Sequence, residues 1–146
     1  MIYLDTSAFL KLYLRESGSQ EVQDFVAAQD DPLPVWDILE GELTNALRLK
    51  AFWKEITEEQ AEDQIVRYRQ RKQQGFYHVP EIDRRALMDA FQILSRETPR
   101  LGCRTLDILH VACANLLKPE AFITFNDRQR SLADHVGLQV PAILKP

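Results

Sequence analysis

Residues 2–8 read IYLDTSA, a short apolar strand pattern that stops on a carboxylate and passes into a helix pattern. From Ala8 to Tyr13 the apolar residues recur at the spacing of one helix face. Asp5 therefore lies between a predicted strand and a predicted helix. An aspartate at this place can cap the helix or bind a metal, and this stretch alone leaves both interpretations open.

The same alternation of strand and helix continues along the chain. Predicted strands are short apolar runs at 2–5, 34–36, 76–79, 121–125 and 138–140. Predicted helices lie at 7–16, 19–29, 38–52, 57–74, 83–96, 106–117 and 127–136, and a loop is predicted at 99–102. We therefore expect an α/β fold, a three-layer sandwich whose central, mostly parallel sheet of about four to five strands is flanked by helices.

The composition restricts the class of protein. With 45% hydrophobic and 27% charged residues, the 146-residue chain is typical of a single globular domain, residues 1–146. Two cysteines, Cys103 and Cys113, are too few for a disulfide framework. The net charge of −4 disfavours broad attraction to nucleic acid, although a cation at a carboxylate site reverses the local field. We expect a cytoplasmic protein with no membrane association, because neither a signal peptide nor a membrane-length apolar run is visible.

Four acidic residues are candidates for a functional site. Besides Asp5, these are Asp107 in the apolar helix RTLDILHVACA, Glu42 on an amphipathic helix, and Asp127 between a strand and a helix. Each has an ordinary interpretation, because the aspartates can cap helices and Glu42 can be a solvated surface residue. Asp107 is the hardest to explain in this way, since a buried aspartate is unfavourable unless it is paired. His110 shares the face of Asp107, where it supports the site or packs.

The predicted topology brings these acids toward one place. The carboxyl ends of parallel strands lie at one edge of the sheet, where the functional clefts of such folds are found. Asp5 and the Asn126–Asp127 pair both follow strands. Crowded carboxylates repel one another unless they are protonated or bridged by a cation. Ligands that are all oxygen favour Mg²⁺, with Mn²⁺ as the alternative, and such an ion activates water for attack on a phosphodiester.

Several segments together resemble one known family. They are the strand leading into Asp5-Thr6-Ser7, GELTNAL around Glu42, the R-x-x-D-x-x-H-x-A-x-A stretch at 104–114, Thr124-Phe125 before an acidic position, and Ala133 with Gly137-Leu138. The pattern is similar to PIN domains, specifically to the small VapC-type toxins of type II toxin–antitoxin pairs. The likeness spans essentially the whole chain. It implies a Mg²⁺-dependent endoribonuclease that acts on RNA, binds a cognate antitoxin protein and forms a homodimer.

The resemblance also implies roles for individual residues. Asp5 and Asp107 match the principal Mg²⁺ ligands, and Glu42 matches the acid that completes the site. Thr6 matches a hydroxyl beside that acid. On the residues themselves, Arg104 is a candidate for binding a substrate phosphate or for bracing a site carboxylate, since it precedes Asp107 by one turn.

The last acidic position departs from the family pattern. The usual Thr-x-Asp falls here on Thr124-Phe125-Asn126, so that Asp127 comes one residue late. Either Asp127 takes this position after a small backbone shift, or Asn126 fills it as a neutral ligand that keeps one acceptor oxygen. The substitution supports an alternative function, a catalytically weak or silent PIN fold that binds RNA or acts as a scaffold.

Two unrelated families also begin with a strand followed by an aspartate. Phosphotransfer enzymes of the haloacid-dehalogenase type need a second aspartate two residues later, where this chain has Ser7. Receiver domains carry their phosphorylated aspartate on a central strand and have paired acids before it, whereas Asp5 follows the first strand. Both families therefore fit the sequence less well.

Two further segments have surface interpretations. In RLKAFWKEIT, Phe52 and Trp53 come at the end of a helix, where they either close the core between two helices or, by family analogy, contribute to an antitoxin-binding surface. The basic stretch RYRQRKQQ at 67–74 is either a solvated helix face or a contact for RNA phosphates.

Overall fold

The computed structural model describes residues 1–142, which form four strands and eight helices. In chain order the elements are β1 (Ile2–Leu4), α1 (Thr6–Leu10), α2 (Ser19–Ala27), β2 (Leu33–Pro34), α3 (Asp37–Phe52), α4 (Glu58–Gln73), β3 (Tyr77–His78), α5 (Arg84–Ser95), α6 (Thr98–Leu101), α7 (Thr105–Leu117), β4 (Ala121–Ile123) and α8 (Asp127–His135). β1 pairs with β4 and β2 with β3, both in parallel. The α/β class, with parallel strands flanked by helices, is therefore confirmed.

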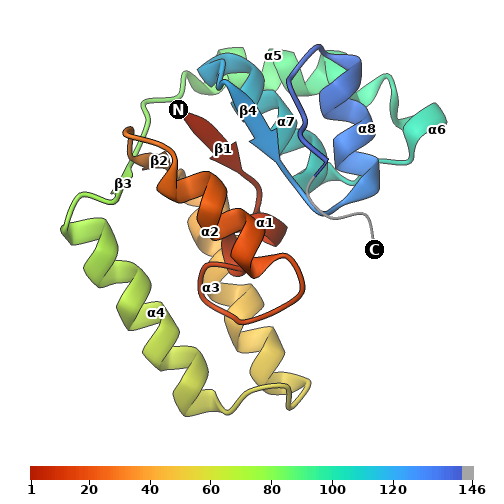
Figure 1. The fold of residues 1–146 in the computed structure, drawn as a ribbon. Coiled ribbons are helices and arrows are strands. Elements are labelled where there is room, and N and C mark those ends of the chain that lie inside the picture. The colour runs from red at the N-terminus through yellow and green to blue at the C-terminus, as the bar shows by residue number, and fades with distance from the viewer. Residues whose placement is uncertain (143–146) are drawn as a thin grey trace.

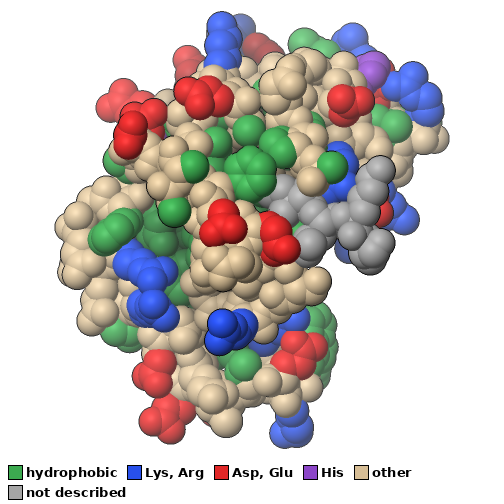
Figure 2. Space-filling view, viewed as in Figure 1, with side chains coloured by type: hydrophobic (Ala, Val, Ile, Leu, Met, Phe, Trp, Pro, Cys, Tyr) green, Lys and Arg blue, Asp and Glu red, His purple; other side chains and the backbone are tan. Residues whose placement is uncertain are grey.

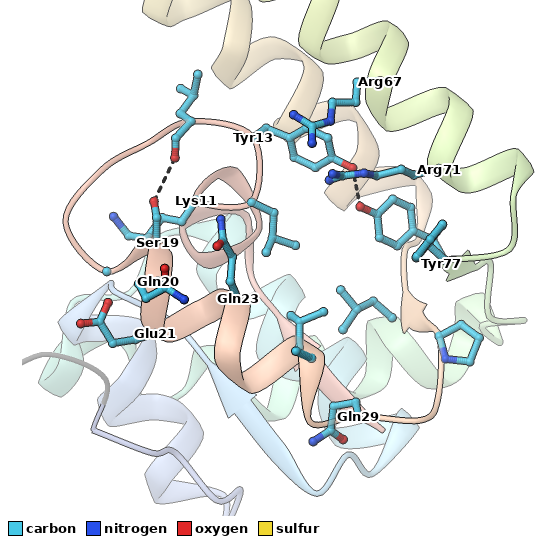
Figure 3. Close-up of a pocket in the computed structure, with 18 of the residues that line it drawn as sticks. Lys11, Tyr13, Ser19, Gln20, Glu21, Gln23, Gln29, Arg67, Arg71 and Tyr77 are labelled. Carbon is cyan, nitrogen blue, oxygen red and sulfur yellow. Dashed lines mark hydrogen bonds between the residues drawn. The ribbon is translucent and has the colours of Figure 1, made fainter.

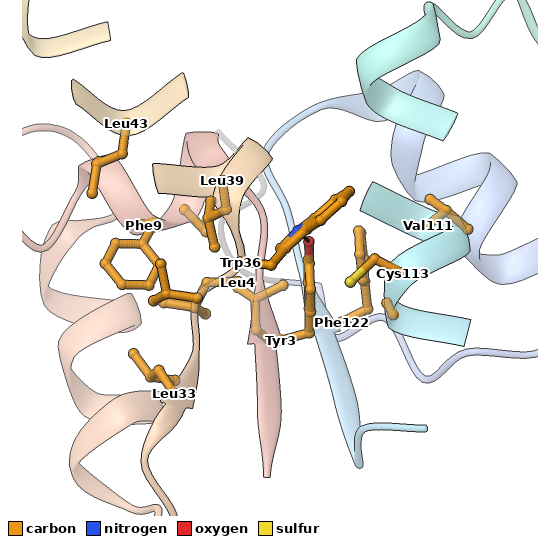
Figure 4. Close-up of a cluster of buried hydrophobic side chains, with 14 of the residues drawn as sticks. Tyr3, Leu4, Phe9, Leu33, Trp36, Leu39, Leu43, Val111, Cys113 and Phe122 are labelled. Carbon is orange, nitrogen blue, oxygen red and sulfur yellow. Dashed lines mark hydrogen bonds between the residues drawn. The ribbon is translucent and has the colours of Figure 1, made fainter. Parts of the chain in front are cut away.

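The strands lie between two groups of helices (Figure 1). α3 packs against α4 on one side, while α5 packs against α7 on the other, and α7 also contacts α8. All three residues of β1 are buried, because helices cover both faces of the strand. Tyr3 stacks on Phe122 of β4 with 5.4 Å between ring centroids, at the centre of the apolar cluster drawn in Figure 4. Paired in parallel, β1 and β4 end at the same edge of the sheet.

Local capping signals set the bounds of α4, the outer helix of the α3–α4 hairpin. The Thr57 hydroxyl accepts a hydrogen bond from the Gln60 N–H at 3.0 Å, and the Gln60 side chain accepts one from the Thr57 N–H at 2.9 Å. This pair of hydrogen bonds is a capping box. Gly75, just beyond the helix end, has φ +86°, a conformation that glycine adopts without strain.

Two predicted elements differ from the structure near the site. The helix predicted at 7–16 ends at Leu10, because the N–H groups of Lys11, Leu12 and Tyr13 bind carbonyls three residues back rather than four. The chain therefore continues in tight turns. The strand predicted at 138–140 does not form, although the Phe122 N–H donates to the Gln139 carbonyl at 2.8 Å.

The loop predicted at 99–102 contains a short helix, α6. Proline at its start supplies the φ that a first helical turn requires, and Gly102 ends the turn with φ +68°. The prediction took Pro99 only as a sign of a loop. A proline in the first turn loses no hydrogen bond, since the N–H groups there have no partner inside the helix.

The two cysteines are buried and unbonded to each other. Burial raises the pKa of the Cys113 thiol to about 12, so that it packs as a small neutral group. No helix within residues 1–142 has both the length and the apolar character needed to cross a bilayer.

Candidate active site

Asp5 follows β1 directly and is almost completely buried, with 3% of its surface exposed. Its carboxylate caps α1 by accepting the Ala8 N–H at 2.9 Å, which confirms the capping interpretation. The Ser7 hydroxyl lies 2.7 and 2.9 Å from the two carboxylate oxygens, and the Thr124 hydroxyl donates to Oδ2 at 2.6 Å. Burial nevertheless raises the pKa of Asp5, against the lowering effect of these hydrogen bonds.

Asp107 lies in the first turn of α7, where it accepts the Arg104 N–H through Oδ2 at 3.1 Å. Its other oxygen, Oδ1, accepts a hydrogen bond from the Asn126 side-chain amide at 3.1 Å. The bracing from Arg104 thus comes from its backbone, while its side chain is exposed to solvent. The apolar pattern of this helix predicts that Asp107 is buried, but its side chain is only half-buried. The free-energy cost of placing a carboxylate in this helix is therefore smaller than expected.

Thr124 and Asn126 connect the two aspartates. The Asn126 N–H donates to Thr124 Oγ1 at 3.0 Å, and Thr124 Oγ1 lies 2.6 Å from Asp5 Oδ2. Through its side chain, Asn126 contacts Asp107 and also caps α8, since its Oδ1 accepts the N–H groups of the next turn at 3.0 and 3.2 Å. A continuous path of hydrogen bonds therefore runs from Asp5 to Asp107.

Glu42 on α3 joins the same cluster through Thr6 and His110. The Thr6 hydroxyl donates to Glu42 Oε1 at 2.9 Å, and His110 Nε2 also contacts this oxygen. Burial raises the pKa of Glu42, but its hydrogen bonds with His110 and Thr6 outweigh this effect, and the net pKa is lowered. The Glu42 side chain is 24% exposed, which contradicts its interpretation as a solvated surface residue.

His110 lies one turn after Asp107 and is buried, with 1% of its surface exposed. Its Nδ1 lies 2.7 Å from the Tyr3 hydroxyl, which in turn accepts a hydrogen bond from Trp36 Nε1 at 2.9 Å. Burial holds the pKa of Tyr3 well above its usual value. His110 thus ties α7 to β1 and α3, which agrees with the expectation that it supports the site.

Asp127 lies apart from this cluster. It is the first residue of α8, its side chain is 95% exposed, and its nearest cation is the Arg130 guanidinium at 3.8 Å. Asn126, and not Asp127, occupies the N-cap and touches Asp107. Of the two candidates for the last acidic position, the geometry therefore favours Asn126, and the catalytic roles of all these residues remain predictions.

The cluster supplies donors of the kind a hard cation prefers. Within residues 1–142, no three Asp, Glu, His or Cys side chains are already grouped closely enough to hold a metal. The oxygens of Asp5, Asp107 and Glu42 instead bind hydroxyl, amide and imidazole groups. None of the hydrogen-bond partners of buried Asp5 in the described part of the chain is a lysine or arginine. A buried carboxylate without a cationic partner, beside further oxygen donors, fits Mg²⁺ or Mn²⁺.

Some contributors to this cluster were not predicted. Ser7 bridges Asp5 to the Phe125 N–H at 3.0 Å. The Oε1 of buried Gln129 lies 2.9 Å from Thr124 Oγ1, and its Nε2 donates to the Asp107 carbonyl at 3.3 Å. One sequence signal was available for Gln129, because it shares a helix face with Leu132 and Ala133, both fully buried. Tyr3 and Trp36 give no such signal, since aromatic residues in apolar runs resemble ordinary core.

A second hollow lies away from the acids. It has a volume of about 1020 Å³ and is bordered by α2, the turns after α1 and the face of α4 that carries Arg67 and Arg71 (Figure 3). The Arg71 guanidinium lies 5.2 Å from the centre of the Tyr13 ring, and the Tyr13 and Tyr77 hydroxyls are hydrogen-bonded. In the space-filling view, basic and apolar side chains lie together where α2 and α4 face each other (Figure 2).

The tip of the α3–α4 hairpin carries exposed aromatic side chains. Phe52 is 77% and Trp53 55% exposed, so the interpretation that they close the core is wrong. α3 extends past the core here, and no described element covers the tip.

The fold and the site define an α/β domain with an acidic cluster at the carboxyl end of parallel strands. The model of the PIN domain family matches residues 2–135, and the chain belongs to this family. Its fold is similar to Mycobacterium tuberculosis VapC20, a sarcin-ricin loop cleaving toxin, with a TM-score of 0.69 and 14% identity over 100% of both chains. It is also similar to Rickettsia felis VapBC2 bound to a DNA fragment from their promoter, with a TM-score of 0.66 and 14% identity over 97% of this chain and 98% of that one. A comparison with curated proteins gave no match.

Proposed function

We propose that the chain is an endoribonuclease that depends on Mg²⁺ or Mn²⁺ and acts in the cytoplasm as the toxin of a type II toxin–antitoxin pair. The observation that carries the proposal is the hydrogen-bond path from Asp5 through Thr124 and Asn126 to Asp107, with Glu42 joined to it by Thr6 and His110. Membership of the PIN family and the fold it shares with VapC20 support the same conclusion.

Asp5 and Asp107 are the residues that would hold the cation, and the Asn126 amide, which donates to Asp107 Oδ1, would orient the Asp107 carboxylate. When bound, the ion polarises a scissile phosphate and lowers the pKa of water. Thr124 and Ser7 orient the Asp5 carboxylate, and the Arg104 N–H orients that of Asp107. These contacts preorganise both acids before any ligand arrives.

Glu42 is the residue that would orient the attacking water and accept its proton. Its lowered pKa keeps it ionised at neutral pH, as a proton acceptor must be. Oε1 is engaged by Thr6 and His110, whereas Oε2 has no hydrogen-bond partner among residues 1–142. We therefore infer that Oε2 is the oxygen that accepts the proton of the attacking water.

Removal of divalent cations tests the nuclease proposal. We expect the purified chain to cleave RNA with Mg²⁺ or Mn²⁺ and to lose activity by about 10²- to 10³-fold in EDTA, because metal stabilisation of the transition state contributes several kcal/mol. The measurement is the initial rate on a mixed RNA substrate, with Mg²⁺ added back as control. Cleavage that is equal with and without EDTA would contradict metal dependence, and no cleavage under any condition would favour a silent PIN fold.

The toxin proposal requires a protein antitoxin. The Rickettsia felis VapBC2 structure supports such a pairing, as does the size of the hollow between α2 and α4, which suits a peptide segment. We infer that a segment of the antitoxin occupies this hollow, and that a homodimer brings two such surfaces together. The aromatic rings of Tyr13 and Tyr77 and the guanidiniums of Arg67 and Arg71 supply the anchors common at interfaces.

A matched pair of substitutions tests the antitoxin site. Ala27 lines the hollow, whereas the next residue, Ala28, is equally exposed and does not. We expect expression of the chain to arrest growth and coexpression of the antitoxin encoded beside it to restore growth. Ala27→Trp should remain toxic despite the antitoxin, because the indole fills the hollow, while Ala28→Trp should still be neutralised. Equal neutralisation of both variants would show that the antitoxin binds elsewhere.

A further inference from the structure

A chain of buried hydrogen bonds reaches Glu42 from the core. Trp36 Nε1 donates to the Tyr3 hydroxyl at 2.9 Å, this hydroxyl lies 2.7 Å from His110 Nδ1, and His110 Nε2 contacts Glu42 Oε1. We propose that Trp36 and Tyr3 are positioning residues that hold His110 as its Nε2–H tautomer, so that the imidazole donates to Glu42 and fixes the direction of its carboxylate. The catalytic consequence of this proposal rests on the proposed nuclease function, whereas the tautomer itself does not.

The direction of the chain follows from the hydrogen-bonding capacity of each group. An indole N–H can only donate, so the Tyr3 oxygen accepts from Trp36. The single hydroxyl proton of Tyr3 is then free to donate to His110 Nδ1. Nδ1 can accept only if the ring proton is on Nε2. Trp36, the first donor in this chain, thereby determines that His110 Nε2, the nitrogen next to Glu42, carries the ring proton.

One competing acceptor lies beside the Tyr3 hydroxyl. The Cys113 thiol is close enough to interact with it (Figure 4). Sulfur is a weak acceptor compared with an imidazole nitrogen, so His110 is the preferred partner for the Tyr3 proton. Rings packed around Tyr3 limit its movement, since it stacks on Phe122 and meets the His110 ring edge-on at 5.9 Å.

The tautomer of His110 decides how many hydrogen bonds hold the Glu42 carboxylate. An Nδ1–H ring would place the Nε2 lone pair against Glu42 Oε1, and two acceptors in a buried contact repel. Thr6 alone would then hold the carboxylate, at 2.9 Å from Oε1. In the Nε2–H form, both His110 and Thr6 donate to Oε1, and Oε2 is left without a hydrogen-bond partner among residues 1–142. Partners of this kind, one step removed from the reacting group, orient it without touching the substrate.

The tautomer is measured directly by NMR of the ¹⁵N-labelled full chain. The chain has three histidines, and His110 is assigned by the loss of its signals in His110→Gln. We expect a pyridine-type shift for Nδ1 and a pyrrole-type shift for Nε2 in the parent protein. His78 provides an internal reference for the opposite tautomer, because its Nδ1 lies 3.2 Å from the Pro32 carbonyl, which can only accept. A protonated Nδ1 in the parent, with or without a proton on Nε2, would overturn the proposal whether or not the chain cleaves RNA.

Tyr3→Phe tests whether the relay sets the tautomer. The variant keeps the ring that packs on Phe122 and removes only the hydroxyl that donates to Nδ1. We expect the His110 spectrum to change to a mixture of tautomers, and kcat for RNA cleavage to fall about 10- to 100-fold with KM unchanged. Tyr68→Phe is the matched control, because it removes the hydroxyl of a buried tyrosine that bonds to Glu40 and not to His110. An unchanged His110 spectrum in Tyr3→Phe would refute the relay.

Two substitutions of His110 distinguish positioning from packing. The amide nitrogen of glutamine reaches about as far as Nε2, so His110→Gln can still donate to Glu42, whereas the shorter His110→Asn cannot. We expect His110→Gln to retain more kcat than His110→Asn by about tenfold, at equal thermal stability. Equal loss in both variants would mean that His110 only fills the core.

Discussion

Asp5→Asn is expected to lower metal-dependent RNA cleavage by about 10²- to 10³-fold while leaving the fold intact, because the substitution removes one charged ligand. The asparagine Oδ1 can still accept the Ala8 N–H that caps α1, and its amide can donate to Thr124 Oγ1. Burial raises the pKa of Asp5, so the charged form disfavours the folded state at neutral pH. The unfolding midpoint should therefore not fall. Initial rates and thermal unfolding are the measurements.

Asp127→Asn is the matched control for this experiment. It makes the same chemical change at an acid that is 95% exposed and lies outside the hydrogen-bond path. We expect the parent rate from this variant and a strong loss from Asp5→Asn. If Asp127→Asn lost activity to the same extent, Asp127 would be the fourth acid after all. Parent activity in Asp5→Asn would remove Asp5 from the site.

The arrangement of Asp5 could be predicted from the sequence because two local signals agreed. The predicted strand at 2–5 ends on Asp5, a helix pattern begins at Ser7, and a parallel sheet places such residues at one edge. Asp107 could be singled out because it interrupts an apolar helix. In both cases the local pattern marks the residue, and the family resemblance adds the role.

Other features depend on contacts that no local pattern carries. The choice between Asn126 and Asp127 depends on the Asn126 N–H that binds Thr124, which turns the Asn126 side chain toward Asp107. The direction of Phe52 and Trp53 depends on how far α3 extends past the core. Whether residues 138–140 form a strand depends on whether β4 offers a free edge. In the structure this segment makes a single backbone hydrogen bond to β4.

Asn126→Asp is expected to make the stability of the chain depend more strongly on bound metal. Its carboxylate would face Asp107, where the amide now donates at 3.1 Å, and two carboxylates repel without a cation. We expect the unfolding midpoint of the metal-free variant to fall below that of the parent. With Mg²⁺ or Mn²⁺ the added charge should tighten binding about tenfold, which corresponds to about 1.4 kcal/mol and to roughly 3–6 °C more metal-induced stabilisation for a chain of this length. Thermal unfolding with and without Mn²⁺ is the measurement.

The N-cap of α8 must be kept constant for this result to be interpretable. Aspartate and asparagine cap helices about equally well, so the bonds that Asn126 Oδ1 accepts from the next turn should survive in Asn126→Asp. Asn126→Ser is the neutral control, because serine also caps but adds no charge. It should show the parent response to Mn²⁺, slightly weakened. If Asn126→Asp were no more responsive to Mn²⁺ than Asn126→Ser, residue 126 would not face a cation, and the assignment of the fourth position to it would be wrong.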